Sequence, residues 1–314
     1  MHGTDSGMCT VRLRGAILYP VTKKATHRPI RRRRLGKRLE ELREAMGFTQ
    51  EQAAEALGLN KGTVSRYEAA VTKISVAHTI AMCDTYGVDP KTKAHLIELA
   101  RRADVRGWWN QYGGATAEWF LDYLALEADT AVLSNYESEL IPGLFQTGEY
   151  AAEVTARMWP TSQPDEEGIR RRVDLRLDRQ KAAFERPRPL TMWAFISEGA
   201  LRRVVGGPQI MVAQLEHVLE LAERPNIIVQ VMPFERGAHA GMLSPFVLLE
   251  FPDPDIDPGV VYLEQRTSSL YLEGASDVTA YTLAIEHLRA GSLDPDQSVG
   301  LIRAIASDLA RSDR

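Results

Sequence analysis

Apolar residues recur at helical spacing in the first third of the chain. Leu35, Leu39, Leu42 and Met46 follow one another at steps of three or four residues, which is the spacing of one face of an amphipathic helix. The same periodicity continues between turn glycines and capping residues as far as residue 104. It predicts one compact module of five short helices, over residues 35–46, 50–57, 60–69, 75–87 and 90–104.

Start and stop signals punctuate this module. Gly47 and Gly58 follow the first two helices, where the left-handed backbone that ends a helix favours glycine. Thr49, with Gln52 three residues later, has the pattern of a capping box. Asn60 is a good N-cap for the third helix. The second and third helices are therefore expected to be joined by a tight turn at Gly58.

Beyond residue 116 the pattern changes to a mixture of helices and short strands. Apolar runs and alternation rich in β-branched and aromatic residues predict strands at 190–196, 226–232, 246–251, 259–263 and 269–272. Helical spacing covers residues 117–127, 148–158, 165–185, 209–222, 276–290 and 295–310. This order predicts an α+β fold for the second part of the chain, without internal repeats.

The two parts differ strongly in charge, although the whole chain carries a formal net charge of only −4. Residues 1–106 hold 20 Lys and Arg against 11 Asp and Glu, a net +9. Residues 107–314 hold 18 against 31, a net −13. A basic head on an acidic body is typical of a protein that binds phosphates through its head alone.

These shifts give a domain division that suits a length of 314 residues. We expect a disordered basic tail at 1–33, a helical domain at 34–106, a Trp- and Gly-rich junction at 107–116, and an α+β domain at 117–314. The basic run from Arg31 to Arg34 is either a solvated leader to the first helix or an arm that contacts a nucleic-acid backbone.

Targeting and redox signals are absent from the sequence. No stretch approaches 18 consecutive apolar residues, and the N-terminus lacks the apolar run and cleavage site of a secretory signal. Cys9 and Cys83 lie far apart and form no metal-binding spacing. We therefore expect a cytoplasmic protein with reduced thiols that does not associate with membranes.

The segment from Thr49 to Glu68 has the features of a helix-turn-helix. Such a motif needs a small residue where two helices cross, a turn glycine, and apolar anchors on the facing sides. These places are filled by Ala54, Gly58, Leu59, Val64 and Tyr67. The remaining positions of the second helix are polar, and the first part of a recognition helix enters the major groove, so these side chains are expected to reach base edges.

This segment resembles the Cro/CI-type (XRE) helix-turn-helix family, over about residues 39–94. The resemblance implies a five-helix, lambda-repressor-like domain that binds double-stranded DNA, commonly as a homodimer. It further implies that Gln50 binds a backbone phosphate and that Arg43 pairs with Glu68 in a structural ion pair. The candidate DNA-binding residues are Gln50, Asn60, Lys61, Gly62, Thr63, Ser65 and Arg66. After Glu68 the chain departs from the family pattern, because residues 69–74 lack its glycine and proline.

A second set of motifs lies in the acidic part. Residues 134–150, a basic helix at 171–180 and the strand end at 231–234 resemble the C-terminal domain of actinobacterial Scr-type regulators, which is antitoxin-like. This resemblance covers about residues 117–309. It implies protein–protein regulation, with a small acidic partner protein encoded nearby.

Other constellations give no chemistry. Asp253, Asp255 and Asp257, with Glu264 beyond them, match calcium-loop positions, but Pro258 stands where the loop needs glycine, so an acidic turn is expected. No nucleophile elbow or phosphate loop is present in the sequence. We expect no catalytic residue, cofactor or metal.

The sequence therefore predicts a DNA-binding transcriptional regulator that is not an enzyme and acts with a small partner protein. The alternative is a small-molecule-sensing regulator whose second domain binds a metabolite. A third hypothesis makes the chain chiefly an antitoxin that sequesters its partner and binds DNA for autoregulation.

Overall fold

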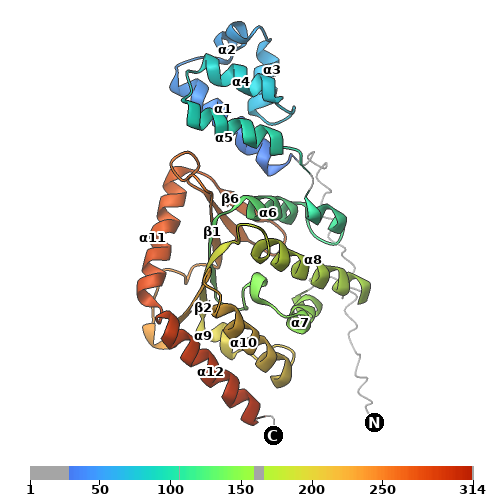
Figure 1. The fold of residues 1–314 in the computed structure, drawn as a ribbon, viewed down its shortest axis with the longest axis vertical. Helices are drawn as coiled ribbons and strands as arrows, with labels where there is room; N and C mark the ends of the chain where they lie inside the picture. Colours follow the sequence, from blue (N-terminus) through green and yellow to red (C-terminus); the bar gives the residue numbers. More distant parts are fainter. Residues whose placement is uncertain (1–27, 106, 159–165, 313–314) are drawn as a thin grey trace, which may run out of the picture.

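The computed structural model describes residues 28–105, 107–158 and 166–312. They form a small helical module at one end of a larger body built on a single sheet (Figure 1). This confirms the expected combination of an all-α domain and an α+β domain. Most of the tail that we expected to be disordered, residues 1–27, lies outside the described residues.

The module consists of the five expected helices. Their bounds are α1 (Ile30–Ala45), α2 (Gln50–Leu57), α3 (Lys61–Glu68), α4 (Val76–Thr85) and α5 (Pro90–Arg102). Side chains of Thr49, Asn60, Ser75 and Asp89 accept hydrogen bonds from first-turn N–H groups and so cap α2 to α5. Their apolar faces meet in one core formed by Leu35, Leu39, Ala53, Ala54, Val64, Tyr67, Ile74, Met82, Cys83, Tyr86, Leu96 and Ala100.

The first helix starts earlier than expected. The prediction placed residues up to 33 in a disordered tail, whereas α1 begins at Ile30 and includes the whole arginine run. The apolar periodicity missed this turn because its one apolar residue, Ile30, is buried in the core of the body rather than in that of the module. The arginines are thus neither a solvated leader nor a free arm.

The body contains a six-stranded mixed sheet in the order β3-β2-β1-β4-β5-β6. β1 pairs in parallel with β2, and β2 with β3, while β4, β5 and β6 continue the other edge as antiparallel neighbours. The strands are β1 (Val132–Glu137), β2 (Thr191–Ser197), β3 (Ile227–Met232), β4 (Phe246–Glu250), β5 (Val260–Glu264) and β6 (Ser269–Leu272).

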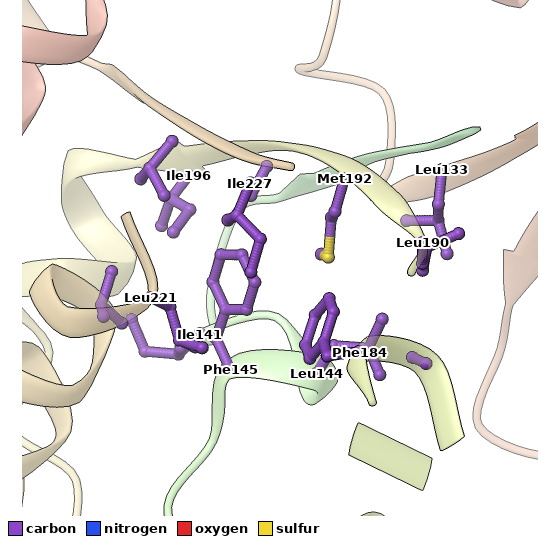
Figure 2. Packing of buried hydrophobic residues seen from close by; sticks show 14 of the residues in the cluster. Leu133, Ile141, Leu144, Phe145, Phe184, Leu190, Met192, Ile196, Leu221 and Ile227 are labelled. Atoms are coloured by element: carbon purple, nitrogen blue, oxygen red, sulfur yellow. The ribbon is translucent and has the colours of Figure 1, made fainter. Parts of the chain in front are cut away.

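Helices cover the two faces of this sheet unequally (Figure 1). One face packs against α6 (Glu118–Asp129), α7 (Gly148–Met158), α8 (Glu166–Phe184), α10 (Pro208–Ala222) and α12 (Pro295–Ser312). The other face packs against α11 (Ala275–Gly291), through Val278, Ile285 and Leu288. Figure 2 shows the larger core, where Met192 and Ile227 from the strands meet Phe145 and Leu221.

Two elements of the body escaped the sequence analysis. β1 is the central strand, but Ser134 and Asn135 in its middle are buried and polar, so it lacks the apolar pattern of a strand. The Asn135 side chain compensates by donating to the carbonyl of Phe246 on β4, at 3.2 Å. The short helix α9 (Glu198–Arg202) has only five residues, too few to establish a period. The expected junction contains a 3-10 helix, Trp108–Tyr112, whose Trp109 is buried in the body.

Candidate nucleic-acid interface

The turn between α2 and α3 fixes the two helices at a crossing. Gly58 adopts the left-handed conformation with φ 63°, and the N–H of Leu59 donates to the carbonyl of Ala54 at 2.8 Å. Asn60 then starts α3, because its side-chain oxygen accepts from the N–H of Thr63 at 2.8 Å. Ala54 and Val64 are buried where the helices meet, as the motif requires.

Burial of one side of α3 leaves the opposite side free. Val64, Tyr67 and Glu68 face the module core. The predicted contact residues lie on the outer side, where Asn60, Lys61, Gly62 and Arg66 are exposed and Thr63 and Ser65 are half-buried. We call these six residues the recognition surface. In Figure 1, α2 and α3 lie at the end of the molecule away from the body, so the body does not cover this surface.

Local bonds hold the polar side chains of this surface. The Thr63 hydroxyl donates to Asn60 Oδ1 at 3.0 Å, and Arg66 Nη2 donates to Thr63 Oγ1 at 3.1 Å. Lys61 forms an exposed ion pair with Glu51 on α2, and the Lys61 ammonium lowers the pKa of the Glu51 carboxyl. These contacts are weak and solvent-exposed, so Lys61 and Arg66 exchange them at little cost for phosphate or base acceptors.

Gly62 contributes open space rather than special backbone geometry. A Cβ built at this position would lie 3.4 Å from Arg66 Nη1 and from Asn60 Oδ1, which is ordinary contact. The fold therefore does not require glycine here. A small residue at the start of a recognition helix lets the backbone approach a groove closely.

A buried polar network connects α1, the N-terminus of α2 and the end of α3. Arg43 on α1 binds Glu68 in a bidentate pair, with Nε–Oε1 at 2.6 Å and Nη2–Oε2 at 3.1 Å, and also donates to the carbonyl of Phe48. Glu68 raises the pKa of Arg43 through this hydrogen bond. Gln50 Nε2 donates to Glu68 Oε2 at 2.8 Å. The residue to which the resemblance assigns a phosphate contact thus also orients this network at the N-terminus of α2.

The turn after α3 departs from its expected sequence but ends the helix in the usual way. Ala70 occupies the left-handed region with φ 55°, and it is the one non-glycine residue with positive φ in the described part of the chain. The N–H of Val71 donates back to the carbonyl of Arg66 at 2.8 Å. Ala70 is 1% exposed, so burial of its methyl group offsets the strain of this conformation.

The acidic turn at residues 253–257, which matched some positions of a calcium loop, binds basic side chains of the helical module. Asp253 binds Lys91 at 2.8 Å, and Asp257 binds Arg34 and lies 3.5 Å from His95, all on the helical module. Within residues 28–105, 107–158 and 166–312, no group of three or more His, Cys, Asp or Glu side chains could hold a metal ion. Sequence patterns missed this role because the partners are more than 150 residues apart.

The body contains a cavity of about 560 Å³, which bears on the metabolite hypothesis. It lies between the end of α7 and the turn before α10, and its lining includes Glu153, Arg157 and Arg203. Arg157 lies 3.9 Å from Glu153, and Arg203 pairs with Glu139, so each arginine has a carboxylate beside it. Nothing in this geometry selects a ligand.

Comparisons with known proteins match two separate parts of the chain. A family model described as a helix-turn-helix domain matches residues 34–96, and one described as a domain of unknown function (DUF5753) matches residues 120–304. Among solved structures, the clp gene regulator ClgR from C. glutamicum is similar at 24% identity, covering 26% of this chain and 99% of that chain, with a TM-score of 0.21. None of the curated proteins matches. In the described residues no helix is both long and apolar enough to span a membrane.

Proposed function

The chain belongs to the family described as a domain of unknown function (DUF5753), and because it joins that domain to a helix-turn-helix domain, we propose that it is a sequence-specific DNA-binding regulator of transcription. The observation that carries this proposal is the recognition surface. It is polar and exposed, on a helix at the end of the molecule away from the body (Figure 1), while the opposite side of the same helix is buried in the module.

The chemistry of this surface suits the major groove. An α-helix fits into the groove, where guanine presents two acceptors to arginine or lysine and adenine pairs with amide side chains. We assign base contacts to Lys61, Gly62 and Arg66, and phosphate or neighbouring base contacts to Thr63 and Ser65. Gln50 lies at the N-terminus of α2, where N–H groups and the helix dipole favour a phosphate.

The regulator acts as a homodimer in this proposal. Recognition helices of this class bind two half-sites about one helical turn apart, which requires two copies of the module. The proposal includes a cytoplasmic location, with which a DNA-binding role is compatible. Its function is binding rather than catalysis.

The body binds a small partner protein in this proposal. What supports this role is an exposed apolar loop after β3: Leu243 is 97% exposed, Met242 66% and Phe234 60%. Large exposed apolar side chains are a feature of protein interaction sites.

Selection of genomic fragments with the purified full-length protein tests the DNA-binding proposal. We expect enrichment of one sequence, and Arg66→Ala should weaken binding to it by about 5- to 150-fold, corresponding to about 1–3 kcal/mol, while relaxing preference at one position. Arg311→Ala is the matched control, because Arg311 is an exposed arginine on α12 with a partner three residues away. An unchanged sequence preference in Arg66→Ala would contradict the assignment.

A further inference from the structure

The first turn of α1 belongs to two domains at once. Ile30 is 1% exposed and lies in the core of the body with Trp109 and Tyr123. Its N–H donates to Asp122 Oδ1 on α6 at 3.0 Å. From Leu35 onward, the same helix contributes to the core of the module. No loop separates the two parts, because the helix is continuous from Ile30 to Ala45.

Two arginines of this turn bind one face of α6. Arg31 donates to both oxygens of Asp129, at 2.6 and 3.0 Å, and to the carbonyl of Ala125 at 2.9 Å. Arg33 donates to Asp122 Oδ2 at 3.2 Å. The Arg31 side chain is only 7% exposed, so its pair with Asp129 is largely withdrawn from water.

Arg34 binds carboxylates from the loop after β4 and from just after β6. Its guanidinium pairs with Asp257, donates to Glu273 Oε2 at 3.2 Å, and lies 4.3 Å from the ring centre of Phe251. The side chains of Arg34 and Asp257 are each 10% exposed. Burial acts to raise the pKa of Asp257, but the hydrogen bond from His95 and the charge of Arg34 outweigh it and hold the pKa below its usual value.

We call residues 30–34 the docking turn and the residues Asp122, Asp129, Asp257 and Glu273 the acidic cradle. The module's positive charge and the body's negative charge therefore meet in a defined set of partly buried pairs. Lys91 with Asp253 and Arg102 with Asp129 extend the same contact at its edge. Paired charges of this kind fix orientation, because each is costly to leave buried alone.

The docking turn is directly connected to the recognition helix. A Cβ built at Gly36, two residues after Arg34, would lie 2.5 Å from the carbonyl oxygen of Glu68 and 2.7 Å from that of Tyr67. The backbone of α1 therefore packs directly against the C-terminal end of α3. Asp104 reinforces this contact, since it binds both Arg32 on α1 and Lys73 in the turn after α3.

The geometry points to a function for the arginine run: the docking turn anchors the DNA-binding module to the body and sets the direction in which the recognition helix faces. The docking itself does not depend on the proposed function. Its consequence for DNA binding rests on that function: in a dimer, the bodies as well as the modules set the spacing between the two recognition helices.

Hydrogen exchange of the full-length protein, without DNA, tests the docking. Arg34→Glu should increase exchange about 10-fold or more in residues 30–36 and 118–129, where docking protects the backbone, and leave α2 to α4 unchanged. Asp257→Asn removes the same contact from the side of the body and should expose the same two segments. Lys37→Glu is the control, because Lys37 is exposed on α1 and pairs with Glu40.

Two outcomes would overturn the inference. One is unchanged exchange at residues 30–36 in both variants, which would mean that the cradle does not hold the turn. The other is increased exchange throughout α2 to α4 in both variants, which would assign Arg34 to the stability of the module. Because neither measurement involves DNA, failure of the DNA-binding proposal would appear separately, in the fragment selection.

Discussion

Arg66 on the recognition surface and Arg34 in the docking turn are chemically identical but differ in what surrounds them. Arg66 is exposed and donates to the hydroxyl of Thr63, a partner without charge. Arg34 is largely buried, pairs with two carboxylates and lies over an aromatic ring. An arginine without a carboxylate partner remains free for an incoming anion, whereas a desolvated and paired arginine has become part of the fold.

The same contrast extends to the two ends of the module. At the outer end, polar side chains are held by neighbours within three residues along α3 and by Glu51 on α2. At the inner end, the arginines of the docking turn are held by partners from 72 to 239 residues away. A change at the outer end should therefore alter contacts with DNA directly and have little effect on stability. A change at the inner end should weaken the docking of the module on the body, and it should affect DNA binding only through the placement of the recognition helices.

The largest effect is expected from Arg43→Ala, which leaves Glu68 charged, buried and without its arginine. We predict that the free energy of unfolding of the module falls by about 3–5 kcal/mol. Chemical denaturation followed by far-UV circular dichroism measures this change. Lys37→Ala on the same helix should shift it by less than about 0.5 kcal/mol, since exposed pairs contribute little. Equal effects of the two substitutions would show that the pair has no structural role.

Ile30→Ala should destabilise the body by about 2–4 kcal/mol, because it leaves a cavity in the larger core. This outcome would be unusual for a residue near the N-terminus of a separate domain. Denaturation monitored by tryptophan fluorescence reports on the body, because every tryptophan of the sequence lies beyond residue 107. Leu35→Ala, five residues later, should destabilise the module instead. If both variants affected the same unfolding transition, the boundary between body and module would not lie between Ile30 and Leu35.

A pH titration compares two carboxyl groups near the end of β1, the half-buried Glu137 and the exposed Glu139. Burial raises the pKa of Glu137, at the end of β1, to about 7. The folded body therefore holds a proton that the unfolded chain releases near pH 4.5, so this contribution to stability is present at low pH and lost as pH rises through about 7. We predict a gain on the order of 2 kcal/mol between pH 8 and pH 5.

The control for this titration is Glu139→Gln, because Glu139 is an exposed carboxylate two residues further along the chain. Glu137→Gln should remove most of the pH dependence, whereas Glu139→Gln should leave it unchanged. Some dependence will remain in Glu137→Gln, since burial also raises the pKa of Glu264, which faces the same arginines, Arg176 and Arg179. A pH dependence in Glu137→Gln equal to that of the parent would exclude Glu137 as its source.

Sequence alone was sufficient where structure is local. The bounds of α2 and α7 match their predicted ranges, because capping residues and turn glycines fix helix ends within a few residues. Sequence alone was insufficient where partners far apart in the chain determine whether a segment becomes a strand or where a side chain binds. Ser134 and Asn135 do not form a strand pattern, yet β1 is central because neighbours on both sides bind it. The sequence left the basic run at 31–34 open between a solvated leader and an arm that contacts a nucleic-acid backbone. Only the folded chain reveals the carboxylates from distant segments that surround it.

The smallest expected effect comes from Gln50→Ala, and it tests whether the outer end is purely a binding surface. If Gln50 contacts a phosphate, the substitution should weaken binding to every DNA sequence alike, by about 1 kcal/mol, and reduce the salt dependence of affinity slightly. Its hydrogen bond to Glu68 adds a cost in stability of about 1 kcal/mol. Gln50→Glu should enlarge both losses, because a carboxylate at this position repels a phosphate and also repels Glu68. Binding measured at two salt concentrations, together with denaturation, shows whether Gln50 contributes to affinity, to stability or to both. A loss of stability without a loss of affinity would assign Gln50 to the supporting network alone. The DNA-binding residues would then all lie on α3 and at its N-cap.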